Sequence, residues 1–171
     1  MMNDHAENND EEKALLKAKS DALRLLSFSA RSSSELRKRL EMKKCPEDLI
    51  DQVIESFTRQ GLLDDKKFAK LYAESRVYSR PTGRKSLEMD LKKKGLTPEL
   101  VSETLSELKD YDEKAMAKEL IRQRLRGMSG VSVEKRKARI FGLLKRRGFG
   151  SDVIFPAMNE AFKEYLSEEL E

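Results

Sequence analysis

The feature that most constrains the fold of this 171-residue chain is an internal repeat. Pairs of apolar residues, spaced four positions apart, recur at offsets of 51 and then 53 residues: Leu36 and Leu40, Leu87 and Leu91, and Ile140 and Leu144. A spacing of four places both members of a pair on one face of an α-helix. Such a period is typical of tandem helical units that bury their apolar faces together.

A shared turn is predicted after each of these helices. Lys94-Gly95-Leu96 and Arg147-Gly148-Phe149 both place a glycine, which ends helices in the left-handed conformation, before an apolar residue. Lys44-Cys45 occupies the equivalent place in the first copy, with lysine instead of glycine. Apolar residues at helical spacing before and after each turn predict two more helices, so each unit has three helices.

We therefore predict an all-α protein of three tandem three-helix repeats, at residues 13–61, 62–108 and 109–171. Only 8 Gly and 4 Pro occur, and Leu, Lys, Glu and Arg recur throughout, which favours helix over strand. Because each unit is small and the connections are short, the repeats are expected to stack into an elongated, curved array. Residues 1–12 lack apolar periodicity and are rich in Asn, Asp and Glu, so we predict a disordered acidic tail there.

The residues that enzymes use for catalysis are scarce in this sequence. The only histidine, His5, lies in the acidic tail, which excludes a histidine base or a zinc cluster. Cys45 aligns with the apolar Leu96 and Phe149, so we interpret it as a small core residue and not as a reactive thiol. Residues 127–130 lack the spacing and the lysine of a phosphate-binding loop. We predict no enzymatic activity, no catalytic residues, no metal and no cofactor.

The sequence also indicates where the protein works. A single cysteine cannot form an internal disulfide, and no stretch of eighteen apolar residues is present. We therefore expect a cytoplasmic protein that does not enter a membrane, and we expect it to be a monomer.

Basic residues cluster in the third repeat. Between Arg122 and Arg147, ten Lys or Arg residues face a single acid, Glu134, which gives this stretch a charge of +9. Helical phase places Lys135, Arg139 and Arg146 opposite the apolar face of their helix, where they can meet phosphate groups. Arg122 and Arg126, spaced four apart on the preceding helix, extend the surface. The alternative interpretation is an ordinary solvated helix face.

Several motifs resemble the RecX family, bacterial regulators of the RecA recombinase. The segment from Arg31 to Leu40, RSSSELRKRL, resembles the family's first-repeat signature. The segment GLLDDKKFA, residues 61–69, with Ser75-Arg76 resembles its junction between the first and second repeats. Gly83-Arg84-Lys85, with Leu87 and the turn at Gly95, resembles its second-repeat pattern. The resemblance extends over about residues 20–163 and is weakest in the third repeat.

This resemblance implies a regulatory protein that binds RecA and the RecA–DNA filament, lying in the helical groove of that filament. It implies inhibition of the ATPase, strand-exchange and coprotease activities of RecA, in recombination, DNA repair and the SOS response. Direct contact with single- or double-stranded DNA is expected as well. The candidate binding residues are all basic: Arg37, Arg84, Lys85, Arg122, Arg126, Lys135, Arg139, Lys145 and Arg146.

A second hypothesis remains open from the residues alone. Three-helix units with basic faces are also typical of independent helix-turn-helix nucleic-acid-binding modules. Tight, salt-dependent binding to bare duplex DNA without any effect on RecA is the behaviour that distinguishes this alternative from a RecA regulator.

Overall fold

The computed structural model describes residues 4–108 and 111–168 and shows nine helices and no strand within them. The predicted all-α fold is therefore confirmed. The helices are α1 (Asp4–Phe28), α2 (Ser33–Met42), α3 (Glu47–Arg59), α4 (Asp65–Ser79), α5 (Arg84–Lys93), α6 (Pro98–Glu107), α7 (Glu113–Leu125), α8 (Val133–Arg146) and α9 (Ser151–Glu168).

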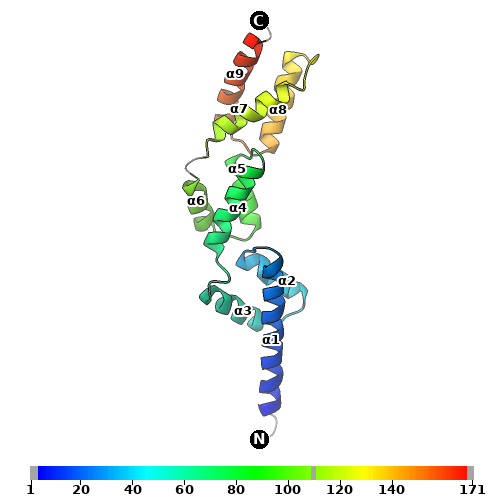
Figure 1. The fold of residues 1–171 in the computed structure, drawn as a ribbon, viewed down its shortest axis with the longest axis vertical. Helices are drawn as coiled ribbons and strands as arrows, with labels where there is room; N and C mark the ends of the chain where they lie inside the picture. Colours follow the sequence, from blue (N-terminus) through cyan, green and yellow to red (C-terminus); the bar gives the residue numbers. More distant parts are fainter. Residues whose placement is uncertain (1–3, 109–110, 169–171) are drawn as a thin grey trace.

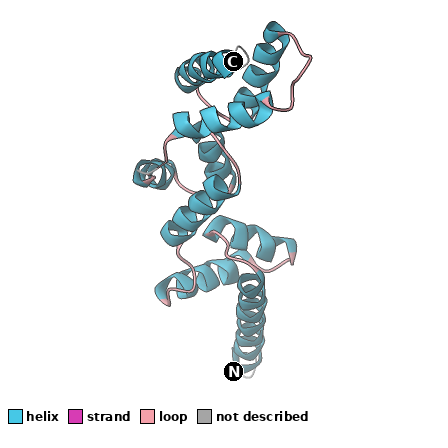
Figure 2. Ribbon diagram, turned by 45° about the horizontal axis from the view of Figure 1, so that its top comes forward, coloured by secondary structure: helices cyan, strands magenta, loops and turns pink. Residues whose placement is uncertain are grey.

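Three successive groups of helices follow one another along an elongated body, with the termini at opposite ends (Figures 1 and 2). Each group has its own apolar core. The repeated pairs predicted from the sequence lie at the centres of these cores, and all six side chains are fully buried. The array is thin because each core is enclosed by only three helices.

The predicted turns adopt the conformation that their sequences indicate. Gly95 and Gly148 have φ angles of 75° and 81°, in the left-handed region where glycine ends helices. Lys44, at the equivalent place in the first repeat, has a φ of 59° and is the one described residue other than glycine with a positive φ. This agreement supports the alignment of the first repeat with the other two.

The first helix is longer than predicted. Helix α1 begins at Asp4, nine residues before the predicted start at Lys13. The prediction of a disordered tail is thus wrong for residues 4–12, and residues 1–3 lie outside the described part of the chain. Carboxylates near a helix N-terminus interact favourably with the helix dipole, so an acidic composition extends this helix instead of interrupting it. Asp10 also pairs with Lys13, at 3.6 Å.

The seam between the first and second repeats is formed by the start of α2, which packs on the turn that follows α5. Ser32 Oγ accepts a hydrogen bond from Glu35 N at 3.1 Å and donates one to the carbonyl of Lys94 at 2.5 Å. Lys94 Nζ in turn pairs with Glu35 at 2.7 Å. Gly95 lies so close to Ser34 that a Cβ atom on this glycine would overlap the serine side chain.

The seam between the second and third repeats uses the same arrangement. The start of α5 packs on the turn that follows α8, where Gly83 N donates to the carbonyl of Arg147 at 2.8 Å. A Cβ atom on Gly148 would overlap Ser86, just as one on Gly95 would overlap Ser34. The equivalent glycines, Gly95 and Gly148, thus each pack on the start of the second helix of the preceding repeat, which makes the array a tandem stack.

No helix in the described ranges is both long enough and apolar enough to cross a membrane.

Candidate functional site

Helix α8 presents a basic face to solvent. Because Ile140 and Leu144 are buried in the third core, Lys135, Arg139 and Arg146 are exposed, as helical phase predicts. None of the three forms an ion pair with another residue that the structure describes. We call these three residues the α8 basic face.

Gly142 shapes this face. It lies one turn before Arg146, and a Cβ atom at this position would be 3.3 Å from Nη1 of Arg146. The missing side chain thus leaves room for the guanidinium group to lie back over Gly142. The face extends from Lys135 to Arg146, over about three turns of α8.

Two of the predicted binding cations are held in intramolecular ion pairs. Arg37 pairs with Asp51 of the neighbouring helix, and this hydrogen bond raises the pKa of Arg37. Arg122 pairs with Glu164 at 2.7 Å and approaches Glu119 at 3.8 Å. The sequence count of +9 missed this neutralisation because Glu164 belongs to α9, 42 residues away from Arg122. Arg37 and Arg122 remain predicted binding residues, but part of their charge is already compensated within the chain.

Arg84 also has an internal role. Its guanidinium group donates hydrogen bonds to the carbonyls of Leu105 and Leu108, at 2.6 and 3.2 Å, and so satisfies the C-terminus of α6. Its backbone N–H donates to Glu113 at 2.9 Å. Arg84 remains a predicted binding residue that also has this structural role, whereas its neighbour Lys85 is exposed.

The remaining two predicted cations, Arg126 and Lys145, belong to the third repeat. Arg126 is exposed at the C-terminus of α7 and forms no ion pair with a described residue. Lys145 is exposed, donates a hydrogen bond to Ser151 Oγ at 3.0 Å, and lies 5.7 Å from the centre of the Phe141 ring. Neither contact neutralises its charge.

Sequence reasoning missed a group of arginines at the seam between the second and third repeats. Arg147 donates a hydrogen bond to the carbonyl of Pro81 at 3.2 Å. Burial, together with the charges of nearby Arg80 and Arg124, lowers the pKa of Arg147. We call Arg80, Arg124 and Arg147 the seam arginines. They follow α4, end α7 and follow α8, so only the fold brings them near one another.

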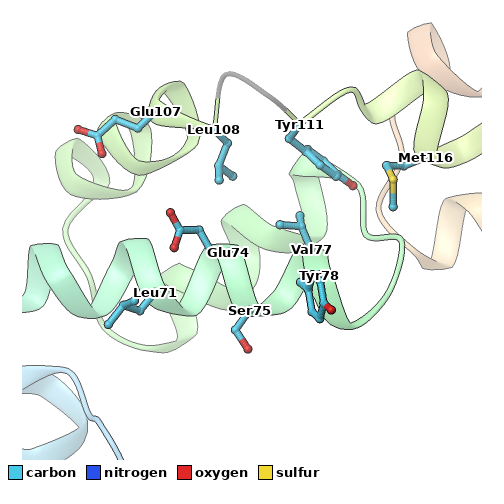
Figure 3. Close-up of a pocket in the computed structure, with 9 residues that line it drawn as sticks. All are labelled: Leu71, Glu74, Ser75, Val77, Tyr78, Glu107, Leu108, Tyr111 and Met116. Atoms are coloured by element: carbon cyan, nitrogen blue, oxygen red, sulfur yellow. The ribbon is translucent and has the colours of Figure 1, made fainter.

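A groove lies between α4, α6 and α7 (Figure 3). Its volume is about 780 Å³, and its lining is mainly apolar with two carboxylates: Leu71, Glu74, Ser75, Val77, Tyr78, Glu107, Leu108, Tyr111 and Met116. Tyr111 is fixed in place because its hydroxyl donates a hydrogen bond to the carbonyl of Thr82. This groove was not predicted from the sequence.

The described residues contain no group of three or more His, Cys, Asp or Glu residues that could hold a metal ion. Cys45 lies half-buried beside the first core, and burial raises the pKa of its thiol, which opposes formation of the reactive thiolate.

Comparison with known proteins identifies the fold and the family. Family models for the first, second and third three-helix domains of RecX match residues 18–57, 64–105 and 111–158. The chain belongs to the RecX family. Each matched range falls inside one of the three repeats predicted from the sequence.

Relatives and solved structures of RecX agree with this assignment. The chain is 30% identical to "Regulatory protein RecX" of Streptomyces coelicolor, over 86% of this chain and 78% of that protein. It is 31% identical to the protein of that name from Amycolatopsis mediterranei, over 89% and 87% of the two chains. The crystal structure of RecX from Lactobacillus salivarius has the same fold, with a TM-score of 0.79 and 23% identity over 88% of this chain and 97% of that one. The chain is thus a member of a family of regulatory proteins.

Proposed function

We propose that this RecX-family protein binds RecA and the RecA–DNA filament, lies in the helical groove of the filament, and inhibits its ATPase, strand-exchange and coprotease activities. The observation that carries the proposal is the α8 basic face, on an elongated three-repeat body that belongs to a family of regulatory proteins. A thin rod fits a groove better than a sphere of equal mass does.

The contact with DNA is assigned to cations that have no internal partner. Lys135, Arg139 and Arg146 are exposed and not neutralised, so they are available to phosphate groups. Arg126, Lys145 and the seam arginines add further positive charge in the third repeat and at its seam with the second. Arginine suits the task because its planar group binds phosphate through two parallel hydrogen bonds.

The test is a triple charge reversal of the α8 basic face, with Lys135→Glu, Arg139→Glu and Arg146→Glu combined. Exposed charges change stability by only about half a kcal/mol each, so the fold is expected to survive. Binding to RecA–DNA filaments, measured by co-sedimentation, should weaken at least tenfold, and its dependence on salt should flatten. Inhibition of the DNA-dependent ATPase of RecA should weaken in parallel.

A charge-matched control separates this face from overall charge. Lys67, Lys70 and Lys93 are exposed in the second repeat and form no ion pair within the described residues, so their reversal to Glu changes the net charge equally. Equal loss of binding by both variants would assign the effect to net charge and refute the α8 basic face. If the wild-type chain left the RecA ATPase and filament stability unchanged at stoichiometric amounts, the proposed function itself would be wrong.

The same reagents test the alternative of an independent nucleic-acid-binding module. In that case the wild-type chain binds bare duplex DNA tightly and with steep salt dependence, while RecA activity is unaffected. A regulator of the filament shows the opposite pattern, with weak binding to bare DNA and a strong effect on RecA.

A further inference from the structure

We propose that the groove between α4, α6 and α7 is a separate docking site for a protein segment that carries a large apolar side chain flanked by Lys or Arg. The inference rests on the proposed function, because the protein subunits of the RecA filament are the partner in which such a segment is sought. It goes beyond that function by assigning protein recognition to one surface of the second repeat and by stating the chemistry of what binds there.

The shape and the lining of the groove favour an apolar side chain. Its volume of about 780 Å³ is within the range of sites that enclose a ligand. Val77, Leu108, Tyr111 and Met116 are each half-buried, so they line a pocket without filling it. Leu71 continues the apolar surface and is 52% exposed. Apolar surface gathered in a concave site is stabilised when a partner covers it.

The charge of the groove favours a basic partner. Glu74 and Glu107 line it, and neither makes an ion pair or a side-chain hydrogen bond with any other described residue. Figure 3 shows the Glu74 side chain pointing from α4 into the space between α4 and α6, whereas the Glu107 carboxylate points away from the other labelled side chains, at the edge of the groove. Other carboxylates of this repeat are satisfied: Asp90 binds Arg76 at 3.0 Å. Two unpaired carboxylates beside an apolar lining are complementary to Lys or Arg next to an apolar anchor.

Tyr78 strengthens the preference for a cation. Its side chain is 95% exposed, and its ring packs on no other described aromatic ring. An exposed tyrosine ring can be covered by a guanidinium or ammonium group, and tyrosine is common among residues that dominate binding energy at protein interfaces. A ring placed at the groove therefore offers both apolar area and attraction for a positive charge.

The same charges argue against nucleic acid as the occupant. Phosphate groups are repelled by Glu74 and Glu107, whereas the α8 basic face attracts them. In Figure 1, α6 lies on the left of the long axis and α8 on the right, and none of the residues that line the groove belongs to α8. A protein segment in the groove and phosphates on α8 would thus contact different residues of one rod.

The experiment compares full-length variants in co-sedimentation with RecA filaments formed on single-stranded DNA. Reversal of both carboxylates, with Glu74→Lys and Glu107→Lys, should weaken binding at least tenfold while affinity for bare single-stranded DNA stays equal or rises. The control, Glu12→Lys with Glu41→Lys, makes the same change in net charge at exposed residues of α1 and α2 and should bind as the wild type does. Tyr78→Ala removes a fully exposed ring without affecting the core, and it should weaken filament binding about fivefold.

Each outcome decides between defined alternatives. If the wild type binds filaments and the groove variants bind equally well, the docking site is refuted while the proposed function stands. Equal weakening by the groove and control pairs would attribute the effect to net charge and would also refute the site. A wild-type dimer in analytical ultracentrifugation that Glu74→Lys with Glu107→Lys dissociates would make a second copy of this chain the occupant, and would overturn the assigned partner. Failure of the wild-type protein to bind filaments would refute the proposed function itself.

Discussion

Replacing Gly95 by alanine is expected to destabilise the protein by about 2 to 5 kcal/mol, because two separate costs add. The backbone at Gly95 has a φ of 75°, where a residue with a Cβ atom costs about 1 to 2 kcal/mol. The new methyl group would also overlap Oγ and Cβ of Ser34 in the neighbouring repeat, and overpacking of this kind costs about 1 to 3 kcal/mol. Rotation of the serine side chain moves Oγ but not Cβ, so the overlap is relieved only if the seam opens.

Gly61→Ala provides the matched control. Gly61 has nearly the same backbone conformation, with a φ of 69°, but a Cβ atom there would meet no atom within 4 Å. Replacing Gly61 by alanine should therefore lower the free energy of unfolding only through the backbone strain, by about 1 to 2 kcal/mol. Urea unfolding followed by far-ultraviolet circular dichroism measures both free energies, and the difference between the two variants isolates the contact across the seam.

A double-mutant cycle with Ser34→Gly tests the contact itself. Removing the serine side chain leaves its Cα atom 3.8 Å from the added methyl group, which is ordinary van der Waals contact. The double variant should then be about 1 to 3 kcal/mol more stable than the sum of the two single-variant losses predicts, because the overlap at the seam is gone. Additive effects, or a cost at Gly95 no larger than at Gly61, would refute the close approach of the two repeats.

Two further predictions concern the cysteine and the acidic end of α9. Cys45→Leu should fold and bind normally, because this half-buried position aligns with Leu96 and Phe149, and loss of filament binding with an intact fold would reveal a role for the thiol. Hydrogen bonds from Lys and Arg side chains of α7 lower the pKa of Glu160 and Glu164 in the folded protein. These two ionised carboxylates therefore stabilise the fold at pH values above the ordinary Glu pKa of about 4.3. The stabilisation is lost as the pH falls through the lower pKa of the folded state. Glu160→Gln with Glu164→Gln should thus lower the Tm by calorimetry near neutral pH, and the difference from wild type should shrink in strong acid; a constant difference would contradict the sign of these shifts.

The fold was predictable because its determinants are local. The spacing of Leu36 and Leu40 is enough to predict a buried helix face, and both side chains are buried. The prediction does not require knowing which distant residues pack against them. Helix ends are equally local: Asp64 accepts a hydrogen bond from Lys67 N at 2.9 Å, and Gly95 has the left-handed conformation expected after a helix. The start of α1 was not predictable in this way, because a polar composition is compatible both with disorder and with an acidic helix N-terminus.

The candidate site was predictable only where exposure follows from helical phase. Lys135 and Arg139 are exposed because the opposite side of α8 is buried, and no distant contact changes that. Arg84 and Arg122 carry the same charge and have similar sequence surroundings, yet their partners come from other helices, 21 and 42 residues away. Sequence spacing cannot distinguish a cation that caps a neighbouring helix from one that faces solvent. The seam arginines and the groove were missed for the same reason, since both are assembled from three elements.

The distribution of charge over the folded surface can orient the protein on a charged partner, which the net charge alone cannot do. The formal net charge of +4 would attract the chain to any polyanion in any orientation. Arg37 and Arg122 are held in ion pairs within the chain, whereas the α8 basic face has no such pair among the described residues. The carboxylates that line the groove come from α4 and α6, and not from α8. If both proposed contacts are made, they align such a rod in one way, with α8 toward the phosphates and the groove toward the protein. On these two proposals, orientation, and with it specificity for a filament over bare DNA, depends on the acidic groove as much as on the basic face.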